Sequence, residues 1–231
     1  MILITRTALL FLMFIVLIAS LASCNPSVSD TDSDSVDVVT KATAARYRTG
    51  EVREYQGKLL EPAIGPRDNS ITGVQTVDIE SYRLTVDGLV NEPLEMTYDE
   101  VIALTPYERL ITLYCVEGWE ASILWKGVRI ADLFDKADVQ SDAVTVIFHA
   151  TDGYTTSLPL DTVLSRDLIL AYQSNGLPLP PEMGFPFIVV AEDKLGYKWA
   201  RWVTRIELSS DPDYLGYWEQ VGYSNEAEVE K

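Results

Sequence analysis

Cys115 is the residue of this chain that is best suited to redox or metal chemistry. The apolar run from Leu110 to Val116 predicts a strand that carries the thiol to its end, and Gly118 then predicts a turn. A strand end that opens into a glycine turn holds a side chain rigidly and still lets it face a cleft. The alternative is a buried structural cysteine, because free cysteine is among the most buried residue types. This stretch alone leaves both interpretations open.

The neighbours of Cys115 limit the chemistry that the thiol could perform. Glu117 and Trp119 are candidates for the wall of a substrate site, with core packing as the alternative for Trp119. A cysteine hydrolase needs a base beside its nucleophile, and His149 is the only histidine. His149 lies at the end of a predicted strand rich in β-branched residues, which favours a core histidine over a catalytic one. Two cysteines and one histidine also exclude a zinc site built from cysteine and histidine, because zinc takes three or four protein ligands.

The N-terminal residues predict the compartment. Arg6 precedes an uncharged segment, Thr7 to Ser23, that is shorter than the ~20 residues needed to span a bilayer comfortably and has the form of a secretory signal. Its end, Leu21-Ala-Ser-Cys24, resembles a bacterial lipoprotein signal, which implies cleavage before Cys24 and a lipid on this cysteine. An uncleaved signal anchor is the alternative. Both predict an extracytoplasmic protein held at a membrane, and lipidation of Cys24 would leave Cys115 as the one free thiol.

Composition divides the chain into four parts. We assign residues 1–23 to a signal peptide, 24–45 to an acidic disordered tether, 46–223 to one domain and 224–231 to a loose acidic tail. The chain has 18 basic and 35 acidic residues, a net charge of −17 and a pI near 4.3. This negative surface argues against nucleic acid and anionic lipid head groups as partners. Membrane attachment is therefore expected from the lipid on Cys24.

Hydrophobic periodicity predicts more strands than helices. The turn residues Asn175 and Gly176 predict a hairpin, since both tolerate positive φ. Residues 125–128 are predicted to turn the chain. Together these patterns indicate an α+β class built on mixed or antiparallel sheets with short helices. The predicted strands cover residues 81–88, 94–96, 110–116, 143–148, 168–172, 177–179, 187–190 and 202–208.

Two short helices are predicted between these strands. Thr97 followed by Glu100 has the pattern of a capping box, which begins a helix that runs through Leu104. A second helix is expected near residues 130–134, where the apolar residues have the spacing of an amphipathic helix.

One segment is basic in this acidic chain. Residues 194–205 contain no acid, and Gly196 and several aromatic residues separate the cations Lys194, Lys198, Arg201 and Arg205. Cations, free backbone N–H groups and aromatic faces suit a ligand that carries a phosphate and a flat ring. The alternative is a β-hairpin whose basic side chains are paired with neighbouring acids. Spacing alone does not choose between the two.

The positioned cysteine and the basic loop together resemble the sulfite oxidase fold of molybdopterin-binding oxidoreductases. The similarity runs from about Asn69 to Tyr223, and the Cys-Val-Glu-Gly-Trp form is closer to the periplasmic methionine-sulfoxide reductase catalytic subunit than to true sulfite oxidases. Several spaced matches in the correct order are stronger evidence than one. The motifs are Cys115-Val-Glu-Gly-Trp119, Trp125-Lys-Gly-Val128, Leu170-Ala-Tyr172 with Asn175-Gly176, Leu179-Pro-Pro181, Gly184-Phe-Pro186, and Gly196-Tyr-Lys198 with Trp202.

The resemblance implies a role for individual residues. Cys115 would be the thiolate ligand of molybdenum, which suits a soft metal and protects the thiol from oxidation. Asn69 falls where the family has a pterin-contacting asparagine, and Thr151 falls near a cofactor-contacting threonine. The segment Trp199-Ala200-Arg201 falls on residues that hold the phosphate end of the cofactor, with Lys198 beside that site.

The implied activity is that of an extracytoplasmic, lipid-anchored molybdenum oxidoreductase. It would perform two-electron chemistry, with oxygen-atom transfer expected, on a small molecule or a sulfoxide-type side chain, and Glu117 would lie at the substrate face. A membrane heme subunit or a cytochrome is the family-level redox partner, because no heme motif or set of cluster-binding cysteines is present.

Two departures from the family keep a second hypothesis open. Met183 and Ile188 stand where relatives often carry polar or basic cofactor contacts, and no twin-arginine signal precedes the apolar segment. The alternative is therefore a lipoprotein that keeps the fold as a binding or interaction module without metal.

Overall fold

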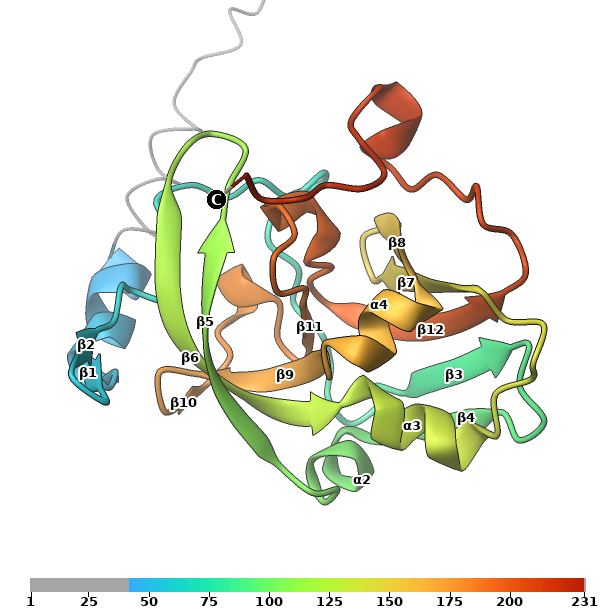
Figure 1. The fold of residues 1–231 in the computed structure, drawn as a ribbon. Coiled ribbons are helices and arrows are strands. Elements are labelled where there is room, and N and C mark those ends of the chain that lie inside the picture. The colour runs from blue at the N-terminus through green and yellow to red at the C-terminus, as the bar shows by residue number, and fades with distance from the viewer. Residues whose placement is uncertain (1–41, 231) are drawn as a thin grey trace, which may run out of the picture. The chain divides into compact units, whose positions relative to one another are not determined.

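Two five-stranded sheets form the frame of the domain, seen in Figure 1. The computed structural model describes residues 42–230. The predicted signal peptide, Cys24 and most of the predicted tether lie outside the described residues. The strands are β1 (Glu54–Tyr55), β2 (Lys58–Leu59), β3 (Leu84–Gly88), β4 (Leu94–Met96), β5 (Tyr107–Tyr114), β6 (Glu120–Arg129), β7 (Thr145–Ala150), β8 (Thr155–Pro159), β9 (Ile169–Ser174), β10 (Leu177–Pro178), β11 (Ile188–Val190) and β12 (Val203–Ser209).

The sheets have different topologies. The first has the order β10-β9-β6-β5, with β11 also paired to β9, and all of its pairs are antiparallel. The second has the order β4-β3-β12-β7-β8, in which β3 and β12 run parallel. The small hairpin of β1 and β2 stands apart from both sheets. The predicted α+β class with mixed and antiparallel sheets is therefore confirmed.

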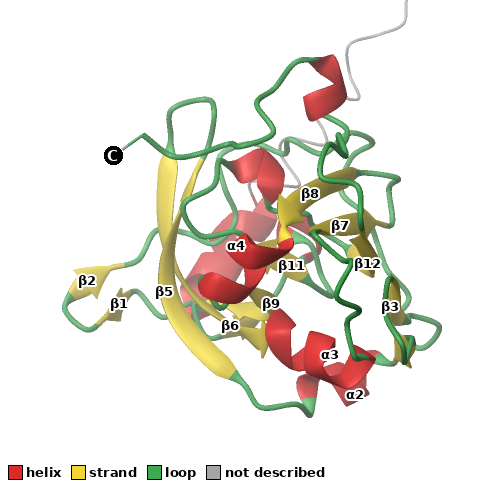
Figure 2. Ribbon diagram, turned by 45° about the vertical axis from the view of Figure 1, so that its right-hand side comes forward, coloured by secondary structure: helices red, strands yellow, loops and turns green. Residues whose placement is uncertain are grey.

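The helices are short, as Figure 2 shows. The capping box predicted at Thr97 is present, because its side chain accepts from the Glu100 N–H while the Glu100 carboxylate accepts from the Thr97 N–H. The predicted amphipathic helix is also confirmed, with Leu133 and Phe134 buried. Besides a helix over residues 42–50, the helices are α2 (Tyr98–Ile102), α3 (Ile130–Ala137) and α4 (Leu160–Ser165), and the 3₁₀ turns are η1 (Pro181–Met183), η2 (Gly196–Lys198) and η3 (Glu219–Val221).

The hairpin of β9 and β10 is built on its turn residues, as predicted. Asn175 and Gly176 have φ angles of 47° and 82°, the left-handed conformation that a two-residue hairpin turn requires. The Asn175 side chain is fully buried, where its Oδ1 accepts from the Leu124 N–H at 3.0 Å and its Nδ2 donates to the Glu61 carbonyl at 2.9 Å. The asparagine thus ties the turn to β6 and to the N-terminal segment.

The predicted turn at residues 125–128 is wrong, because these residues lie inside β6. The glycine has a different purpose there: the register between β6 and β9 shifts between Lys126 and Gly127. A Cβ on Gly127 would lie 2.2 Å from the Leu170 carbonyl oxygen, so glycine permits the close approach of the two strands. Gly127 therefore marks a β-bulge within a strand and not the end of one.

The predicted ends of the domain also need correction. A helix covers residues 42–50, so residues 42–45, the last of the predicted tether, are helical. The tail is not loose, since Ala227 is buried and its carbonyl accepts from the Leu195 N–H at 2.8 Å. Lys194 Nζ donates to Glu228 Oε1 at 2.6 Å. Acidic composition predicted solvation, but a buried lysine supplies the partner that the tail needs.

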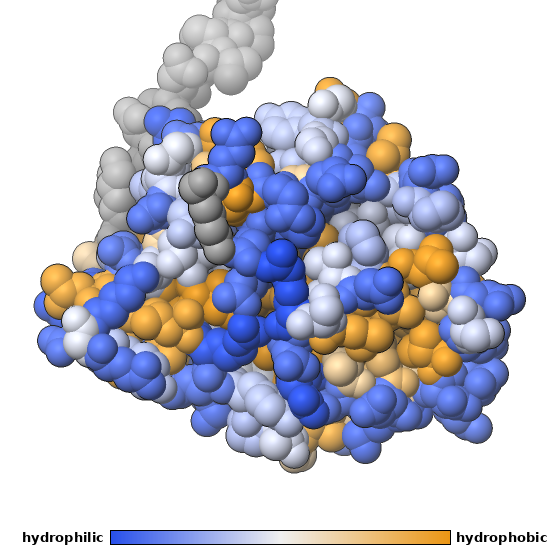
Figure 3. Space-filling view, in the orientation of Figure 1, coloured by the Kyte–Doolittle hydropathy of each residue, from blue (hydrophilic) through white to orange (hydrophobic). Residues whose placement is uncertain are grey.

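The face of the molecule shown in Figure 3 is largely hydrophilic, with apolar patches between the charged side chains. Beneath it, one continuous core joins both sheets and includes the large side chains Trp125, Phe148 and Phe187. Within residues 42–230 there is no helix both long and apolar enough to cross a membrane.

Candidate cofactor site

Cys115 lies in the loop that joins β5 to β6, at the strand end where it was predicted. The last pair of the hairpin is Tyr114 with Glu120, and the Cys115 N–H donates to the Trp119 carbonyl at 2.9 Å. The Gly118 N–H donates to the Cys115 carbonyl at 3.0 Å, and Gly118 has a φ of 85° that favours glycine. These bonds fix the backbone on both sides of the thiol.

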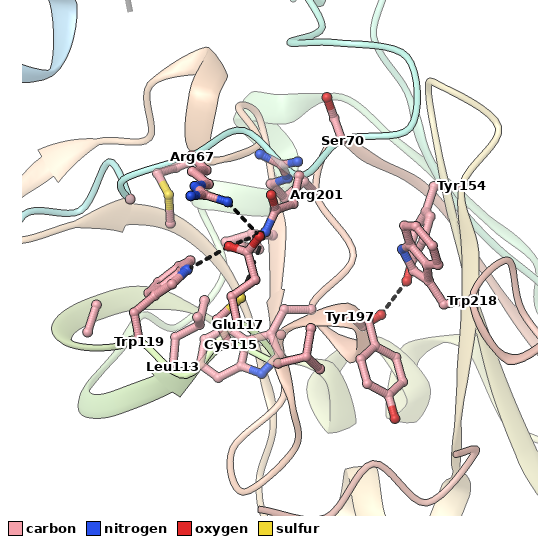
Figure 4. Close-up of a pocket in the computed structure, with 18 of the residues that line it drawn as sticks. Arg67, Ser70, Leu113, Cys115, Glu117, Trp119, Tyr154, Tyr197, Arg201 and Trp218 are labelled. Atoms are coloured by element: carbon pink, nitrogen blue, oxygen red, sulfur yellow. Dashed lines mark hydrogen bonds and ion pairs between the residues drawn. The ribbon is translucent and has the colours of Figure 1, made fainter. Parts of the chain in front are cut away.

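The thiol faces a cavity of about 410 Å³, drawn in Figure 4. The cavity brings together most of the residues that the resemblance singled out. Of these, Asn69, Cys115, Glu117, Trp119, Trp199 and Arg201 line it. Met183 and Ile188 also line it, so the two apolar departures do face the site.

Polar side chains surround the mouth of the cavity beside Cys115. Asn69 Nδ2 lies 3.8 Å from Cys115 Sγ and 3.5 Å from Glu117 Oε2. Glu117 also accepts from the Trp119 indole at 3.2 Å and pairs with Arg67 at 3.3 Å, as the dashed lines in Figure 4 show. Glu117 therefore organises the three side chains that frame the thiol.

The thiol and the carboxylate have opposite pKa shifts. Burial raises the pKa of the Cys115 thiol above its ordinary value, the Glu117 charge adds to the rise, and backbone N–H groups and Asn69 oppose it. Hydrogen bonds from Trp119 and Asn69 lower the pKa of Glu117. Without a bound cation the thiol is therefore protonated at neutral pH. A metal ion at the sulfur would supply the positive charge that holds a thiolate.

Arg201 supplies a cation to the interior of the cavity. Its Nη1 donates to the Glu182 carbonyl at 2.8 Å, its Nη2 pairs with Asp68 at 3.0 Å, and its guanidinium lies 4.3 Å from the ring centre of Trp202. Burial lowers the pKa of Arg201 and Asp68 opposes this, but the group keeps its charge at any physiological pH. A Cβ on Gly184 would lie 2.7 Å from Arg201 Cβ, so glycine is required beside this side chain.

Lys198 is not a cavity residue, although the resemblance placed it beside the phosphate site. Its side chain is fully buried and its ammonium donates to the Ser157 carbonyl at 3.0 Å, to Asn225 Oδ1 at 2.8 Å and to Glu219 Oε1. All three N–H groups are therefore used within the protein. Burial lowers the pKa of Lys198, and the Glu219 carboxylate acts against that shift.

Two further predicted residues stand behind the cavity wall. Ala200 is fully buried, and its carbonyl accepts from the Val189 N–H at 2.9 Å. Thr151 is exposed, with its N–H bonded to the Trp202 carbonyl at 3.0 Å, and it adjoins the lining residue Asp152. Neither side chain lines the cavity, so a ligand in the cavity would contact these positions only after a movement of the chain, or would contact the residues next to them instead.

The basic segment follows the alternative interpretation in part. It does not form a β-hairpin, because η2 precedes β12, but each of its four cations is paired with an acid. The pairs are Lys194 with Glu228, Lys198 with Glu219, Arg201 with Asp68, and Arg205 with Asp87 and Glu207. Of the four, Arg201 alone lines the cavity.

The structure argues against a cysteine hydrolase. His149 lies on β7, its Nε2 is 2.9 Å from Glu207 Oε2, and it does not line the cavity. Cys115 therefore has no histidine base within its site.

Sequence reasoning missed part of the lining. Arg67 and Asp68 directly precede Asn69 and pair with Glu117 and Arg201, so the segment around Asn69 carried a stronger signal than one residue. On the opposite side lie Tyr154, Tyr197 and Trp218, as Figure 4 shows, and Tyr223 lines the cavity next to Trp218. The aromatic density near residues 214–223 was a visible signal for the last two.

The donor set fits a molybdenum cofactor. One cavity thiol suits a metal whose remaining ligands come from a cofactor, since the described residues contain no group of three or more His, Cys, Asp or Glu that could hold a metal ion. Arg201 suits a phosphate, and the aromatic walls suit a flat ring. Fold and site together define a class of cofactor-dependent enzymes.

Comparison with known families agrees with this class. The chain matches the family described as "Oxidoreductase molybdopterin binding domain" over residues 71–218. The chain belongs to this family of molybdopterin-binding oxidoreductases, and its cofactor is molybdenum with molybdopterin.

Three similar proteins give the relationship more detail. The "Uncharacterized oxidoreductase YuiH" of Bacillus subtilis is 40% identical over 147 residues, 63% of this chain and 74% of that protein. The "Putative protein-methionine-sulfoxide reductase subunit YedZ1" of Azospira oryzae is 34% identical over 151 residues, 65% of this chain and 57% of that protein. The sulfane dehydrogenase SoxCD of Paracoccus pantotrophus shares the fold, with a TM-score of 0.58, 22% identity, and coverage of 60% of this chain and 41% of that chain.

Proposed function

We propose that this protein is a lipid-anchored, extracytoplasmic molybdenum oxidoreductase that transfers an oxygen atom to or from a small molecule or an oxidised side chain. The observation that carries the proposal is the position of Cys115, the one free thiol among residues 42–230, on a fixed loop that faces the cavity. When bound, the molybdenum centre supplies the two-electron change and the exchange of oxygen. The protein holds the metal through Cys115 and the cofactor through Asn69 and Arg201.

The charges around the thiol favour a neutral substrate over an oxyanion. The two arginines that line the cavity are already paired, Arg67 with Glu117 and Arg201 with Asp68. Much of the remaining wall is apolar or aromatic. With Arg201 assigned to the phosphate of the cofactor, an oxyanion such as sulfite would be left with Arg67, which already pairs with Glu117, whereas a neutral sulfoxide has no charge to desolvate. The name of the Azospira relative, a putative methionine-sulfoxide reductase subunit, points to the same substrate class.

The proposed reaction is the reduction of a sulfoxide to a sulfide. The S–O bond breaks, the oxygen leaves as water after taking up two protons, and two electrons enter from a redox partner. Such a partner is needed because the described residues provide no further redox centre. A membrane heme subunit or a cytochrome could supply the electrons, and the lipid expected on Cys24 would keep the enzyme at the membrane where such proteins work.

A substrate comparison tests this proposal. The mature enzyme, isolated from its own envelope, is supplied with an artificial electron donor and dimethyl sulfoxide, and with an artificial acceptor and sulfite. We expect turnover of dimethyl sulfoxide and a kcat/KM for sulfite that is lower by about tenfold or more, the consequence of about 1.4 kcal/mol of lost transition-state stabilisation. Efficient sulfite oxidation without sulfoxide reduction would contradict the proposal.

A further inference from the structure

A segment near the C-terminus forms one wall of the cofactor cavity. This C-terminal arm, residues 214–225, contributes Trp218 and Tyr223 to the lining. The Trp218 ring centre lies 5.2 Å from that of Tyr223 and 5.3 Å from that of Tyr217, and Tyr223 in turn lies 5.3 Å from Tyr197. Figure 4 shows Trp218 across the cavity from Trp119. The arm therefore closes the side of the cavity that faces away from the cysteine loop.

Lys198 holds this arm through its buried ammonium. Glu219, at the centre of the arm, has no exposed side-chain surface, and its Oε1 accepts from Lys198 and from Thr156 Oγ1 at 2.8 Å. The same ammonium donates to Asn225 Oδ1 at 2.8 Å, at the end of the arm, and to the Ser157 carbonyl at 3.0 Å. One lysine thus ties two points of the arm to β8.

The other hydrogen bonds of the arm are single bonds to its backbone. The arm contains no strand; its Tyr217 N–H donates to the Thr155 carbonyl at 2.8 Å, its Tyr214 carbonyl accepts from Ser157 Oγ at 3.1 Å, and its Ser224 carbonyl accepts from the Tyr197 hydroxyl at 2.7 Å. Gly216 packs so closely that an added Cβ would lie 2.4 Å from the Thr155 oxygen. Loss of the lysine would leave the Glu219 carboxylate buried without its counter-charge, which favours release of the arm into water.

The other residues that line the cavity offer the cofactor few charged contacts. Met183 and Ile188 present apolar side chains, Lys198 faces away, and Arg201 is shared with Asp68. We propose that the C-terminal arm retains the molybdopterin: Trp218 and Tyr223 contact the bound cofactor through their ring faces, and the Lys198–Glu219 pair positions them. The inference concerns how the cofactor is held and does not depend on the substrate.

Cofactor release from the mature holoenzyme tests the inference. The wild type is compared with Lys198→Met, which keeps the aliphatic stem and removes the ammonium, and with Trp218→Leu, which keeps the Lys198–Glu219 pair and removes the indole ring. We expect molybdopterin, measured as the pterin that leaves the protein on dilution, to dissociate about tenfold faster or more from Lys198→Met and several-fold faster from Trp218→Leu. Hydrogen exchange of amides 214–225 should quicken in Lys198→Met and stay unchanged in Trp218→Leu.

Lys194→Met is the matched control. Lys194 is also a buried lysine bonded to the C-terminal residues, but it holds Glu226 and Glu228, beyond the arm, and does not line the cavity. Its variant should release the cofactor at close to the wild-type rate. Equal release from both lysine variants, or wild-type retention in Lys198→Met despite faster exchange in the arm, would overturn the inference. A wild type that oxidises sulfite instead of reducing sulfoxides would refute the proposed function and leave this inference standing.

Discussion

Replacing Arg201 by methionine separates cofactor binding from fold stability. The side chain is 18% exposed and holds the Glu182 carbonyl and Asp68, so the change leaves a carbonyl and a half-buried carboxylate without their donor. Partial exposure of Asp68, at 27%, lets water replace much of that interaction, and we expect a loss of roughly 1–2 kcal/mol in the free energy of unfolding. The fold should therefore survive the substitution.

The effect on the cofactor should be larger than the effect on the fold. A hydrogen bond to a charged group contributes roughly 1.5–3 kcal/mol, which corresponds to about a 10–150-fold change in affinity for the phosphate end of molybdopterin. The assay measures pterin and molybdenum per chain after prolonged dialysis, beside thermal unfolding of the same samples. We expect Arg201→Met to lose most of its pterin under conditions in which the wild type keeps it.

Arg205→Met provides the matched comparison. Arg205 is also paired with acids, Asp87 and Glu207, but it lies on β12 away from the cavity lining. This variant should keep its pterin while showing a comparable loss of stability. Wild-type pterin content in Arg201→Met, or an equal loss from Arg205→Met, would refute the assignment of Arg201 to the cofactor.

Three further substitutions test the frame that positions the site. Asn175→Ala should lower the free energy of unfolding by roughly 3–5 kcal/mol in denaturant titrations, because it leaves the buried Leu124 N–H without its acceptor and disfavours the positive φ at this position. A loss below about 1 kcal/mol would contradict this. Gly127→Ala should prevent native β6–β9 pairing, since its Cβ would meet the Leu170 oxygen at 2.2 Å, and a wild-type melting temperature would refute the close approach. Burial raises the pKa of Tyr47 to about 12 from 10, so its stabilising contribution should be complete below pH ~10 and fade between pH ~10 and 12. The measurement is the difference in the free energy of unfolding between the wild type and Tyr47→Phe, and a difference that stays constant from pH ~8 to 12 would contradict this.

Local signals in the sequence were sufficient for much of the fold. The capping box at Thr97, the hairpin turn at Asn175 and the position of Cys115 at a strand end all depend on neighbouring residues, and the structure contains each of them. Gly127 was misinterpreted because a glycine that ends a strand and a glycine that admits a neighbouring strand look alike until the partner is known. Strand pairing is long-range information that periodicity does not carry.

The site was predicted less completely than the fold. The motif around Cys115 and the residues Asn69 and Arg201 do meet at one cavity, and the resemblance had brought them together. The direction of Lys198 could not be read from the sequence, because its buried partner Glu219 belongs to a segment that had been assigned no contact. Clustered cations alone do not indicate a ligand, because acids of the same fold can pair with them, as Glu219 pairs with Lys198.

The most direct test of the central claim is X-ray absorption at the molybdenum edge, measured on the mature wild type and on Cys115→Ser. Cys115 is the free thiol of the cavity, so among the described residues it is the one that can add a thiolate sulfur to the sulfurs of the cofactor. We predict that the variant keeps the fold and shows one sulfur ligand fewer at the metal than the wild type. The same number of sulfur ligands in both proteins would contradict the assignment of Cys115 as the molybdenum ligand.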